Sequence, residues 1–496
     1  MSGYENYTLS PVPWIKQMPG HWGLVRGKNL YQKMQRPTSD TDEVVTCFRD
    51  GTVTLRKNRR TTGFTESLKE IGYQGIRKGD LVIHVMDAFA GSIGVSDSDG
   101  KGTPVYSVCQ AKGNSNNQYY ALLLREMARS GYIQSLYRGI RERSSDFRFE
   151  VFAAQFYPVP PREEQDQIVR FLDWKVSSIN KLISNYRHQI VLLEEMKQRK
   201  IDEAVVKGMR KSALIHNHDV RWDIDYPEHW QIRRIRESFS FRKGLSITKA
   251  NLVETGIAVI SYGQVHSKKN SGVGLNEELI RYVNESYLTT NQSCLVEKGD
   301  FIFADTSEDV TGCGNCAYID WDDTIFAGYH SIIAHPDGST NNKYLAYLFK
   351  SLTWRYQIRK KVNGVKVYSI TQKMLKDAFI LIPPDDEQKE IVRYLDEVCA
   401  KIDAAIKKME EKIANLQDLK IRLVADTVTG KIDVRSIEIP EYEFVDEDID
   451  NADENLEQGA DVQKVLFVTK SDKGCRNYWV KNHVVLIKNN DDSKLP

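Results

Sequence analysis

Hydrophobic and polar positions follow a seven-residue period in two separate stretches of the chain. In each stretch, apolar side chains occupy the first and fourth positions of about four successive heptads. A seam of this length predicts a coiled coil rather than an ordinary surface helix. The seam positions are Val169, Leu172, Val176, Ile179, Ile183, Tyr186, Ile190 and Leu193 in the first stretch, and Val392, Leu395, Cys399, Ile402, Ile406, Met409, Ile413 and Leu416 in the second.

Both stretches open with one motif, Pro-Pro-x-x-Glu-Gln-x-x-Ile-Val-Arg-x-Leu-Asp, at residues 160–173 and again at 383–396. Proline and acidic residues suit the first turn of a helix, and Gly208 and Gly430 are plausible stops. A helix of about 45 residues is roughly 65–70 Å long. Because a compact domain separates the two copies, we expect the helices to pack as an antiparallel pair. A gap-free repeat of this length indicates an internal duplication.

Shorter repeated motifs indicate one globular domain before each helix. Pro-x-His-Trp occurs at 19–22 and 227–230, and Lys-Gly-Asp precedes β-prone residues at 78–80 and 298–300. Strand-like runs alternate with helix-like ones, so we predict two α/β (α+β) domains in tandem with two long heptad helices. The predicted division is 1–158 and 210–381 for the globular domains, 159–209 and 382–435 for the spacer helices, and 436–496 for a tail.

Composition limits the class of protein. With 496 residues, 41% of them hydrophobic, we expect a soluble chain with several structural units. It has no apolar run long enough to span a membrane and no secretory signal at residues 1–5, and its seven cysteines are an odd number. These features predict a cytoplasmic location.

The net charge of +1 hides two opposite regions. Residues 436–458 contain ten acidic residues and no Lys or Arg, which predicts a disordered, solvated tail. Residues 1–435 carry a net charge of +8, which is compatible with binding to nucleic acid and is weak evidence alone.

Several polar loops are candidates for DNA contact, because Lys and Arg neutralise phosphates while Arg, Asn and Gln can read base edges. The basic run at 56–60 favours DNA over a solvated loop, whereas Met86 and Asp87 are as readily an ordinary turn. Each candidate in the second domain taken alone is more often a local structural feature than a base reader. The candidates are Arg56, Lys57, Asn58, Arg59, Arg60, Met86 and Asp87, and Lys243, Ser246, Thr248, Gln264, His266, Lys268, Tyr329, His330, Lys366 and Ser369.

Motifs for catalysis or metal binding are weak. Cys313 and Cys316 form a C-x-x-C without a second close pair, so we expect no metal site. Asp385, Glu387 and Lys389 superficially mimic a nuclease site, but they crowd a helix start instead of converging on Mg²⁺. With no methylation motif or Walker A loop found, we predict a chain that is not an enzyme by itself.

The repeated Pro-Pro-x-x-Glu-Gln openings, the heptad helices and the Pro-x-His-Trp starts resemble the specificity subunit of type I restriction-modification systems over residues 1–435. This resemblance implies two target-recognition domains that each read half of a bipartite, asymmetric site in double-stranded DNA. It implies that the coiled coil sets the spacing and binds two methylation subunits, and that restriction and translocase subunits join them in host defence. S-adenosylmethionine, ATP and Mg would belong to those partners, in a bacterial or archaeal cytoplasm without membrane association. The competing hypothesis is a coiled-coil scaffold that binds proteins and reads no DNA.

Overall fold

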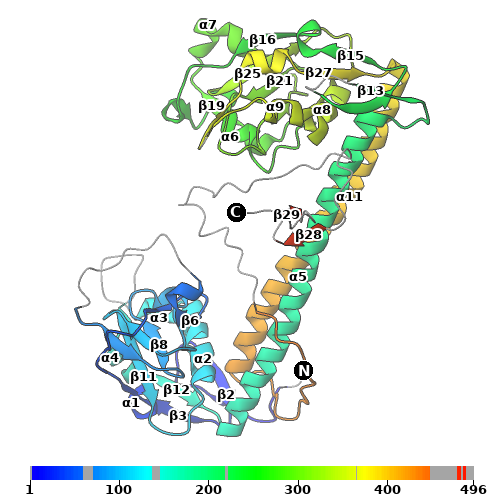
Figure 1. The fold of residues 1–496 in the computed structure, drawn as a ribbon. Helices are drawn as coiled ribbons and strands as arrows, with labels where there is room; N and C mark the ends of the chain where they lie inside the picture. Colours follow the sequence, from blue (N-terminus) through cyan, green and yellow to red (C-terminus); the bar gives the residue numbers. More distant parts are fainter. Residues whose placement is uncertain are drawn as a thin grey trace, which may run out of the picture. The chain divides into compact units, whose positions relative to one another are not determined.

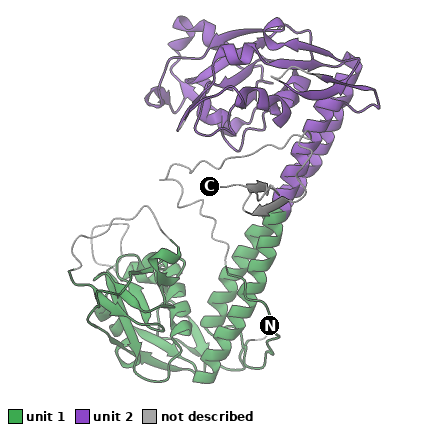
Figure 2. Ribbon diagram, viewed as in Figure 1, with its two compact units in different colours: residues 1–188, 409–459 green, residues 189–408, 460–496 purple. Residues whose placement is uncertain are grey.

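The computed structural model describes residues 3–59, 71–136, 146–217, 222–364, 366–446, 478–481 and 484–487. The chain divides into two compact units, drawn in different colours in Figure 2. Unit 1 contains residues 1–188 and 409–459, and unit 2 contains residues 189–408 and 460–496. Each unit therefore combines one globular domain with part of both long helices.

The two long helices are α5 (Arg162–Lys207) and α11 (Asp385–Val428), seen as coiled ribbons in Figure 1. Gly208 and Gly430 follow them with positive φ angles of 69° and 77°, the conformation that ends many helices. Within unit 1, the Lys420 Nζ is 3.4 Å from Asn180 Oδ1, and Lys412 lies over the Tyr186 ring. Residue numbers rise along one helix as they fall along the other, so the antiparallel coiled coil is confirmed.

The seam residues lie where the heptad pattern places them, and they differ in how deeply they are buried. Val169, Leu172, Ile179 and Ile183 in unit 1, and Leu395, Cys399 and Ile402 in unit 2, are buried. The other seam positions are half-buried. These are Val176, Tyr186, Ile190, Leu193, Val392, Ile406, Met409, Ile413 and Leu416.

The globular part of unit 1 is built on a four-stranded antiparallel sheet in the order β4-β11-β8-β9. Its strands are β4 (Tyr31–Lys33), β11 (Tyr106–Ala111), β8 (Leu81–His84) and β9 (Ile93–Val95). The remaining elements are β1 (Tyr7–Leu9), β2 (Gln17–Pro19), β3 (Gly23–Arg26), α1 (Gly27–Leu30), β5 (Val45–Cys47), β6 (Val53–Leu55), η1 (Arg56–Asn58), β7 (Gln74–Ile76), η2 (Ala88–Ala90), β10 (Gly100–Gly102), α2 (Asn117–Arg129), α3 (Tyr132–Ser135), α4 (Phe149–Ala154) and β12 (Phe156–Val159).

Unit 2 repeats this sheet with the order β16-β25-β21-β23. Its strands are β16 (Phe239–Lys243), β25 (Ser331–Pro336), β21 (Phe301–Ala304) and β23 (Cys316–Tyr318). Unit 2 adds a five-stranded sheet in the order β17 (Leu252–Val253), β19 (Arg281–Val283), β18 (Ile257–Ile260), β24 (Ile325–Ala327) and β20 (Leu295–Val296), in which β18 and β24 run parallel. The strand-like runs of the sequence include 51–55, 81–85, 258–261 and 301–304, and they overlap β6, β8, β18 and β21.

Unit 2 contains further elements outside these two sheets. They are β13 (Leu214–Asn217), β14 (Ile224–Pro227), β15 (Gln231–Arg234), η3 (Ile235–Glu237), η4 (Lys249–Asn251), α6 (Tyr262–Val265), η5 (Glu277–Leu279), α7 (Tyr287–Thr290), η6 (Gln292–Cys294), β22 (Thr306–Ser307), α8 (Asn342–Lys350), α9 (Leu352–Arg359), β26 (Tyr368–Ser369), α10 (Gln372–Lys376), β27 (Phe379–Ile382), β28 (Tyr478–Lys481) and β29 (Val484–Ile487).

Each globular domain shares one hydrophobic core with its helical segments. In unit 1, Tyr119 and Leu123 of α2 belong to the same buried cluster as Phe171 and Leu172 of α5. In unit 2, Tyr344 and Leu348 of α8 cluster with Ile391 and Leu395 of α11. The predicted division into globular domains and spacer helices stays a prediction, although the packing joins each domain to the helices beside it.

The start of the predicted tail contacts unit 1. Residues 437–445 lie along α5 in unit 1, although most of their side chains are exposed. Gln167 Nε2 donates to the Ile437 carbonyl (2.7 Å), and Ser177 Oγ both donates to the Glu443 carbonyl (2.9 Å) and accepts from Val445 N (2.6 Å). The side chains of Ile437 and Ile439 pack against the unit 1 core. This segment is held mainly by its backbone, and the solvated tail predicted from composition stays a prediction. Residues 447–477 lie outside the described part.

Within the described residues, no helix is both long enough and apolar enough to cross a membrane.

Candidate nucleic-acid interface

The shared Glu of the two helix openings binds the shared His-Trp pair of each globular domain. In unit 1, Glu164 accepts hydrogen bonds from the Tyr4 hydroxyl (2.6 Å) and Trp22 Nε1 (2.9 Å), and its other oxygen lies 2.7 Å from His21 Nε2. In unit 2, Glu387 lies 2.7 Å from His229 Nε2 and accepts from Trp230 Nε1 at 3.0 Å. Two motifs that are far apart in the sequence therefore form one buried junction, present once in each unit.

The neighbouring Gln of each opening holds the first turn of a second helix. Gln165 Oε1 accepts from Asn116 N (2.9 Å), and Gln388 Oε1 accepts from Asn341 N (2.8 Å). Asn116 and Asn341 in turn cap α2 and α8 through their side-chain oxygens. The Glu-Gln motif thus contacts the chain's own domains, as expected of a structural element, and leaves DNA contact to other surfaces.

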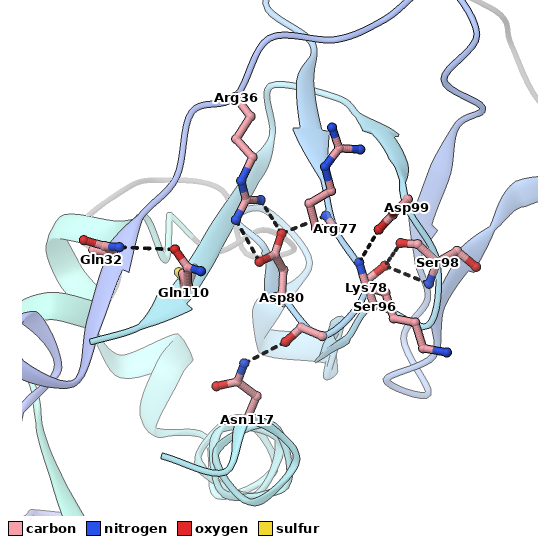
Figure 3. Close-up of polar contacts among 12 residues, drawn as sticks. Gln32, Arg36, Arg77, Lys78, Asp80, Ser96, Ser98, Asp99, Gln110 and Asn117 are labelled. Atoms are coloured by element: carbon pink, nitrogen blue, oxygen red, sulfur yellow. Dashed lines mark hydrogen bonds and ion pairs between the residues drawn. The ribbon is translucent and has the colours of Figure 1, made fainter. Parts of the chain in front are cut away.

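The repeated Lys-Gly-Asp turn is also structural. Asp80 Oδ2 accepts from Arg77 N (2.8 Å), and Figure 3 shows the carboxylate facing the guanidinium of Arg36. Nearby, Asn117 Nδ2 donates to the Gly79 carbonyl at 2.6 Å. In unit 2, Asp300 accepts from Glu297 N (2.9 Å) and faces His335 Nδ1 (2.6 Å). Burial raises the pKa of Asp300.

The basic run of unit 1 forms the short helix η1 and the turn after it. Lys57 forms an ion pair with Glu43, and Asn58 Nδ2 donates to Thr54 Oγ1 (2.8 Å). Arg59 donates to Asp50 Oδ2 (2.6 Å), and its guanidinium lies 4.2 Å from the centre of the Phe48 ring. Arg56 is half-buried in η1. Arg60 lies outside the described residues.

Met86 and Asp87 form the turn after β8. Met86 is exposed, and Asp87 accepts from Arg49 Nη2 at 3.1 Å. Arg49 and Asp50 belong to the turn between β5 and β6, which the structure therefore brings beside the β8 turn. A mixed cluster of charged side chains lies here instead of the purely basic surface that the run at 56–60 indicated.

In unit 2, five chain segments converge at the end of β21, around His330. Gly244 N donates to the Ser331 carbonyl (3.1 Å) and Leu245 N to the Ala327 carbonyl (2.8 Å). Tyr262 N donates to the Tyr329 carbonyl (3.2 Å), Asp305 N to the His330 carbonyl (3.1 Å), and Ile370 N to the Asp305 carbonyl (2.7 Å). The candidates Lys243, Ser246, Gln264, His266, Tyr329, His330 and Ser369 lie on or beside these segments.

Aromatic rings surround the centre of this convergence. The ring of Tyr262 lies 5.4 Å from His330, 5.6 Å from Tyr329 and 6.2 Å from His266, measured between centroids. His330 Nδ1 is 3.2 Å from Asp305 Oδ1 and 3.3 Å from Thr306 Oγ1. Its backbone φ is +54°, a conformation that non-glycine residues seldom adopt and that occurs at no other non-glycine position among the described residues.

Comparison with known proteins agrees with this architecture. Residues 227–415 match the family model of the type I restriction modification DNA specificity domain. The specificity subunit of the type I restriction enzyme MjaVIII from Methanocaldococcus jannaschii is 22% identical over 322 residues, which cover 64% of this chain and 70% of that protein. The EcoKI specificity subunit from Escherichia coli is 23% identical over 290 residues, which cover 55% of this chain and 57% of that protein. Residues 227–415 thus carry a type I restriction modification DNA specificity domain, and the resemblance predicted from the repeated motifs is confirmed.

A solved structure from work on complex assembly and conformational transition of the type I R-M system has the same fold as this chain. The TM-score is 0.61 at 16% identity, and the superposition covers 84% of this chain and 99% of that one. That likeness concerns the fold; the family model and the named relatives confirm the function predicted from the repeated motifs, DNA specificity in a type I system. The scaffold hypothesis gains no support.

Some candidates of this specificity subunit are already engaged within the chain. His266 Nε2 donates to the Thr306 carbonyl (2.8 Å), while its Nδ1 accepts from Asn315 Nδ2 (3.1 Å). Gln264 Oε1 accepts from Ser261 N (3.1 Å), and Thr248 Oγ1 donates to Asn251 Oδ1 (3.0 Å). These contacts hold the loops in place. They leave these side chains with fewer free donors and acceptors for DNA.

Other candidates keep exposed positions. Lys243, Ser246, Lys268, Lys366 and His330 are exposed, as is Ser369 of β26, which lies opposite Thr306 of β22. Whether any of them contacts DNA stays a prediction.

Sequence reasoning missed Tyr262, Asp305 and Thr306 as members of the His330 cluster. The only available signal was position: Asp305 and Thr306 directly follow the β21 strand, as Met86 and Asp87 follow β8 closely. Their pairing with His330 depends on contacts between distant segments, which a single sequence does not reveal.

Cys313 and Cys316 are buried free thiols. Burial raises their pKa values to about 11 and about 12, so both are protonated and unreactive at neutral pH. In the described part of the chain, no group of His, Cys, Asp or Glu has a geometry suited to a metal ion.

Proposed function

We propose that each globular domain reads one half of a bipartite, asymmetric DNA site, and that the paired helices set the spacing between the halves. The observation that supports this most strongly is the duplication itself. The sheet order and the Glu-His-Trp junction are the same in both units, whereas the loops at the sheet ends differ in sequence. A common framework with divergent loops suits two readers of different sequences.

The helix pair would also dock two methylation subunits, which restriction and translocase subunits would join. Catalysis would reside in those partners, with S-adenosylmethionine, ATP and Mg bound by them. This chain would supply targeting in the cytoplasm of a bacterial or archaeal cell. Exposed apolar side chains on the helices, among them Leu182 and Leu419 in unit 1 and Leu192 in unit 2, are compatible with protein docking.

A domain exchange tests the proposal. The chain is co-produced with its methylation subunits, and residues 210–381 are replaced by the corresponding domain of a relative with a different target. Methylome sequencing should show one half of the target changed and the other half retained. A change in both halves, or no bipartite target for the unaltered chain, would contradict the proposal.

The spacer has a separate test. Insertion of one helical turn near residue 207 should lengthen the gap between the half-sites and leave both half-site sequences unchanged. Altered half-site sequences would show that the helices do more than set spacing.

A further inference from the structure

The His330 cluster has features of a built contact site. The left-handed backbone at His330 is strained for a β-carbon-bearing residue, and such strain persists where the surrounding structure enforces it, often at functional sites. At His330 the neighbouring backbone is held by the Asp305 N–His330 carbonyl bond and the Tyr262 N–Tyr329 carbonyl bond. The result is an imidazole that is 57% exposed yet held from one side.

Asp305 fixes the orientation and the tautomer of that imidazole. The Asp305 carboxylate accepts from Thr306 Oγ1 (2.8 Å), so it is fixed in position beside His330 Nδ1 at 3.2 Å. A carboxylate can only accept a hydrogen bond, so the ring proton lies on Nδ1. In the neutral imidazole this leaves Nε2, on the opposite edge of the ring, as a hydrogen-bond acceptor.

The same pair of backbone hydrogen bonds occurs in unit 1 without these side chains and without a positive φ at the position of His330. Val85 N donates to the Val105 carbonyl (2.9 Å) and Phe147 N to the Val85 carbonyl (3.2 Å), as Asp305 N does to His330 and Ile370 N to Asp305. Val85 and Val105 therefore stand where unit 2 has Asp305 and His330. Because the valines maintain the same hydrogen bonds, the fold does not require the Asp-His pair.

We propose that His330, held by Asp305 and packed against Tyr262, is a specificity-determining contact for one half of the DNA site. An acceptor at the exposed ring edge recognises an exocyclic amino group in the major groove, which only adenine (N6) and cytosine (N4) present there. This inference rests on the proposed function of unit 2 as a reader of one half-site.

The test compares His330→Gly with the unaltered chain, each co-produced with the methylation subunits. Glycine adopts the positive φ readily, so the variant keeps the loop conformation and removes only the imidazole. The melting temperature should not fall. Methylome sequencing should show discrimination relaxed by about 5- to 150-fold at one base pair of a single half-site, the range for a direct base contact. The other half-site should be unchanged.

Base analogues identify the group that is read. Duplexes carry purine for adenine, or 2-pyrimidinone for cytosine, at the affected position, and both lack the amino group. The unaltered chain should lose affinity for one of these duplexes, and His330→Gly should show no further loss. Equal loss in both chains would overturn the assignment of the amino group to His330.

Two further variants separate a specific role from general damage. Asp305→Asn should weaken discrimination at the same base pair, because the amide no longer enforces the ring proton on Nδ1. Lys298→Ala removes an exposed charge at the opposite end of β21 and should leave the target unchanged. If His330→Gly and Asp305→Asn both keep the target base for base, this inference fails while the proposed function stands. If the unaltered chain has no bipartite target, both fail.

Discussion

The two units share a framework down to single hydrogen bonds and differ in the side chains placed on it. Sheet order, helix caps and the Glu-His-Trp junction recur, whereas Val85 and Val105 in unit 1 correspond to Asp305 and His330 in unit 2. The same backbone hydrogen bonds form whether the residues are apolar, as in unit 1, or polar, as in unit 2. The comparison shows that these positions can change chemistry without changing the fold, as is needed when two domains must recognise different sequences.

The largest loss of stability is expected when the Glu-His-Trp junction, which both units share, is disrupted. Glu164→Ala removes the acceptor for the buried Trp22 Nε1 and the Tyr4 hydroxyl and should destabilise unit 1 by about 3 kcal/mol. Glu387→Ala should destabilise unit 2 to a similar extent, because Trp230 Nε1 loses the same partner. Hydrogen exchange read by mass spectrometry would resolve the two units separately.

Glu163→Ala is the matched control for that experiment, because Glu163 is the exposed neighbour in the same helical turn. It should change protection in neither unit. Protection lost equally in both units after Glu164→Ala would mean that the junctions do not act locally, and that unit 1 and unit 2 unfold together.

The segment after α11 breaks the symmetry, since only unit 1 has residues 437–445 laid along its α5 helix. Truncation after Arg435 removes the bonds to Gln167, Ser177 and Asn180 and the burial of Ile437 and Ile439. Unit 1 should lose about 2 kcal/mol and unit 2 nothing. Truncation after Asp446 keeps every one of these contacts and should be neutral. An equal loss of stability in both truncations would place the stabilising contacts beyond residue 446.

Sequence alone predicted the parts of this comparison that repeat. The heptads, the Pro-Pro-x-x-Glu-Gln openings and the Gly208 and Gly430 stops depend on local pattern and propensity, so they were readable. The His21–Glu164 and His229–Glu387 contacts join residues more than 140 positions apart, and only the recurrence of both motifs indicated that they belong together. The site residues were harder to predict, because Lys57 and Arg59 of the basic run pair with Glu43 and Asp50 and because the His330 cluster assembles from five segments.

Substitution of the Asp that ends each opening motif is expected to change stability least. The change should have opposite signs in the two units. In unit 2, Asp396 accepts from the Tyr347 hydroxyl (2.7 Å) and pairs with Lys343 Nζ (3.2 Å). In unit 1, Leu122 and Gln118 stand at the positions of Tyr347 and Lys343, and Asp173 lies with them in a cavity of about 650 Å³. Among the described residues Asp173 has no hydrogen-bond or ion-pair partner, and burial raises its pKa.

Opposite stability changes should therefore follow from the same substitution. A raised pKa means that folding favours the protonated Asp173, so its ionised form weakens unit 1 once the pH exceeds the folded pKa. Asp173→Asn should stabilise unit 1 slightly at pH 7. It should have no effect below the ordinary carboxyl pKa of about 3.9, where the group is protonated in both states. Asp396→Asn removes the pair with Lys343 and should destabilise unit 2 by about 0.5 kcal/mol at pH 7. Hydrogen exchange at pH values spanning this range measures both effects. A gain in unit 1 that persisted in acid would show that Asp173 weakens the unit through its packing and not through its charge.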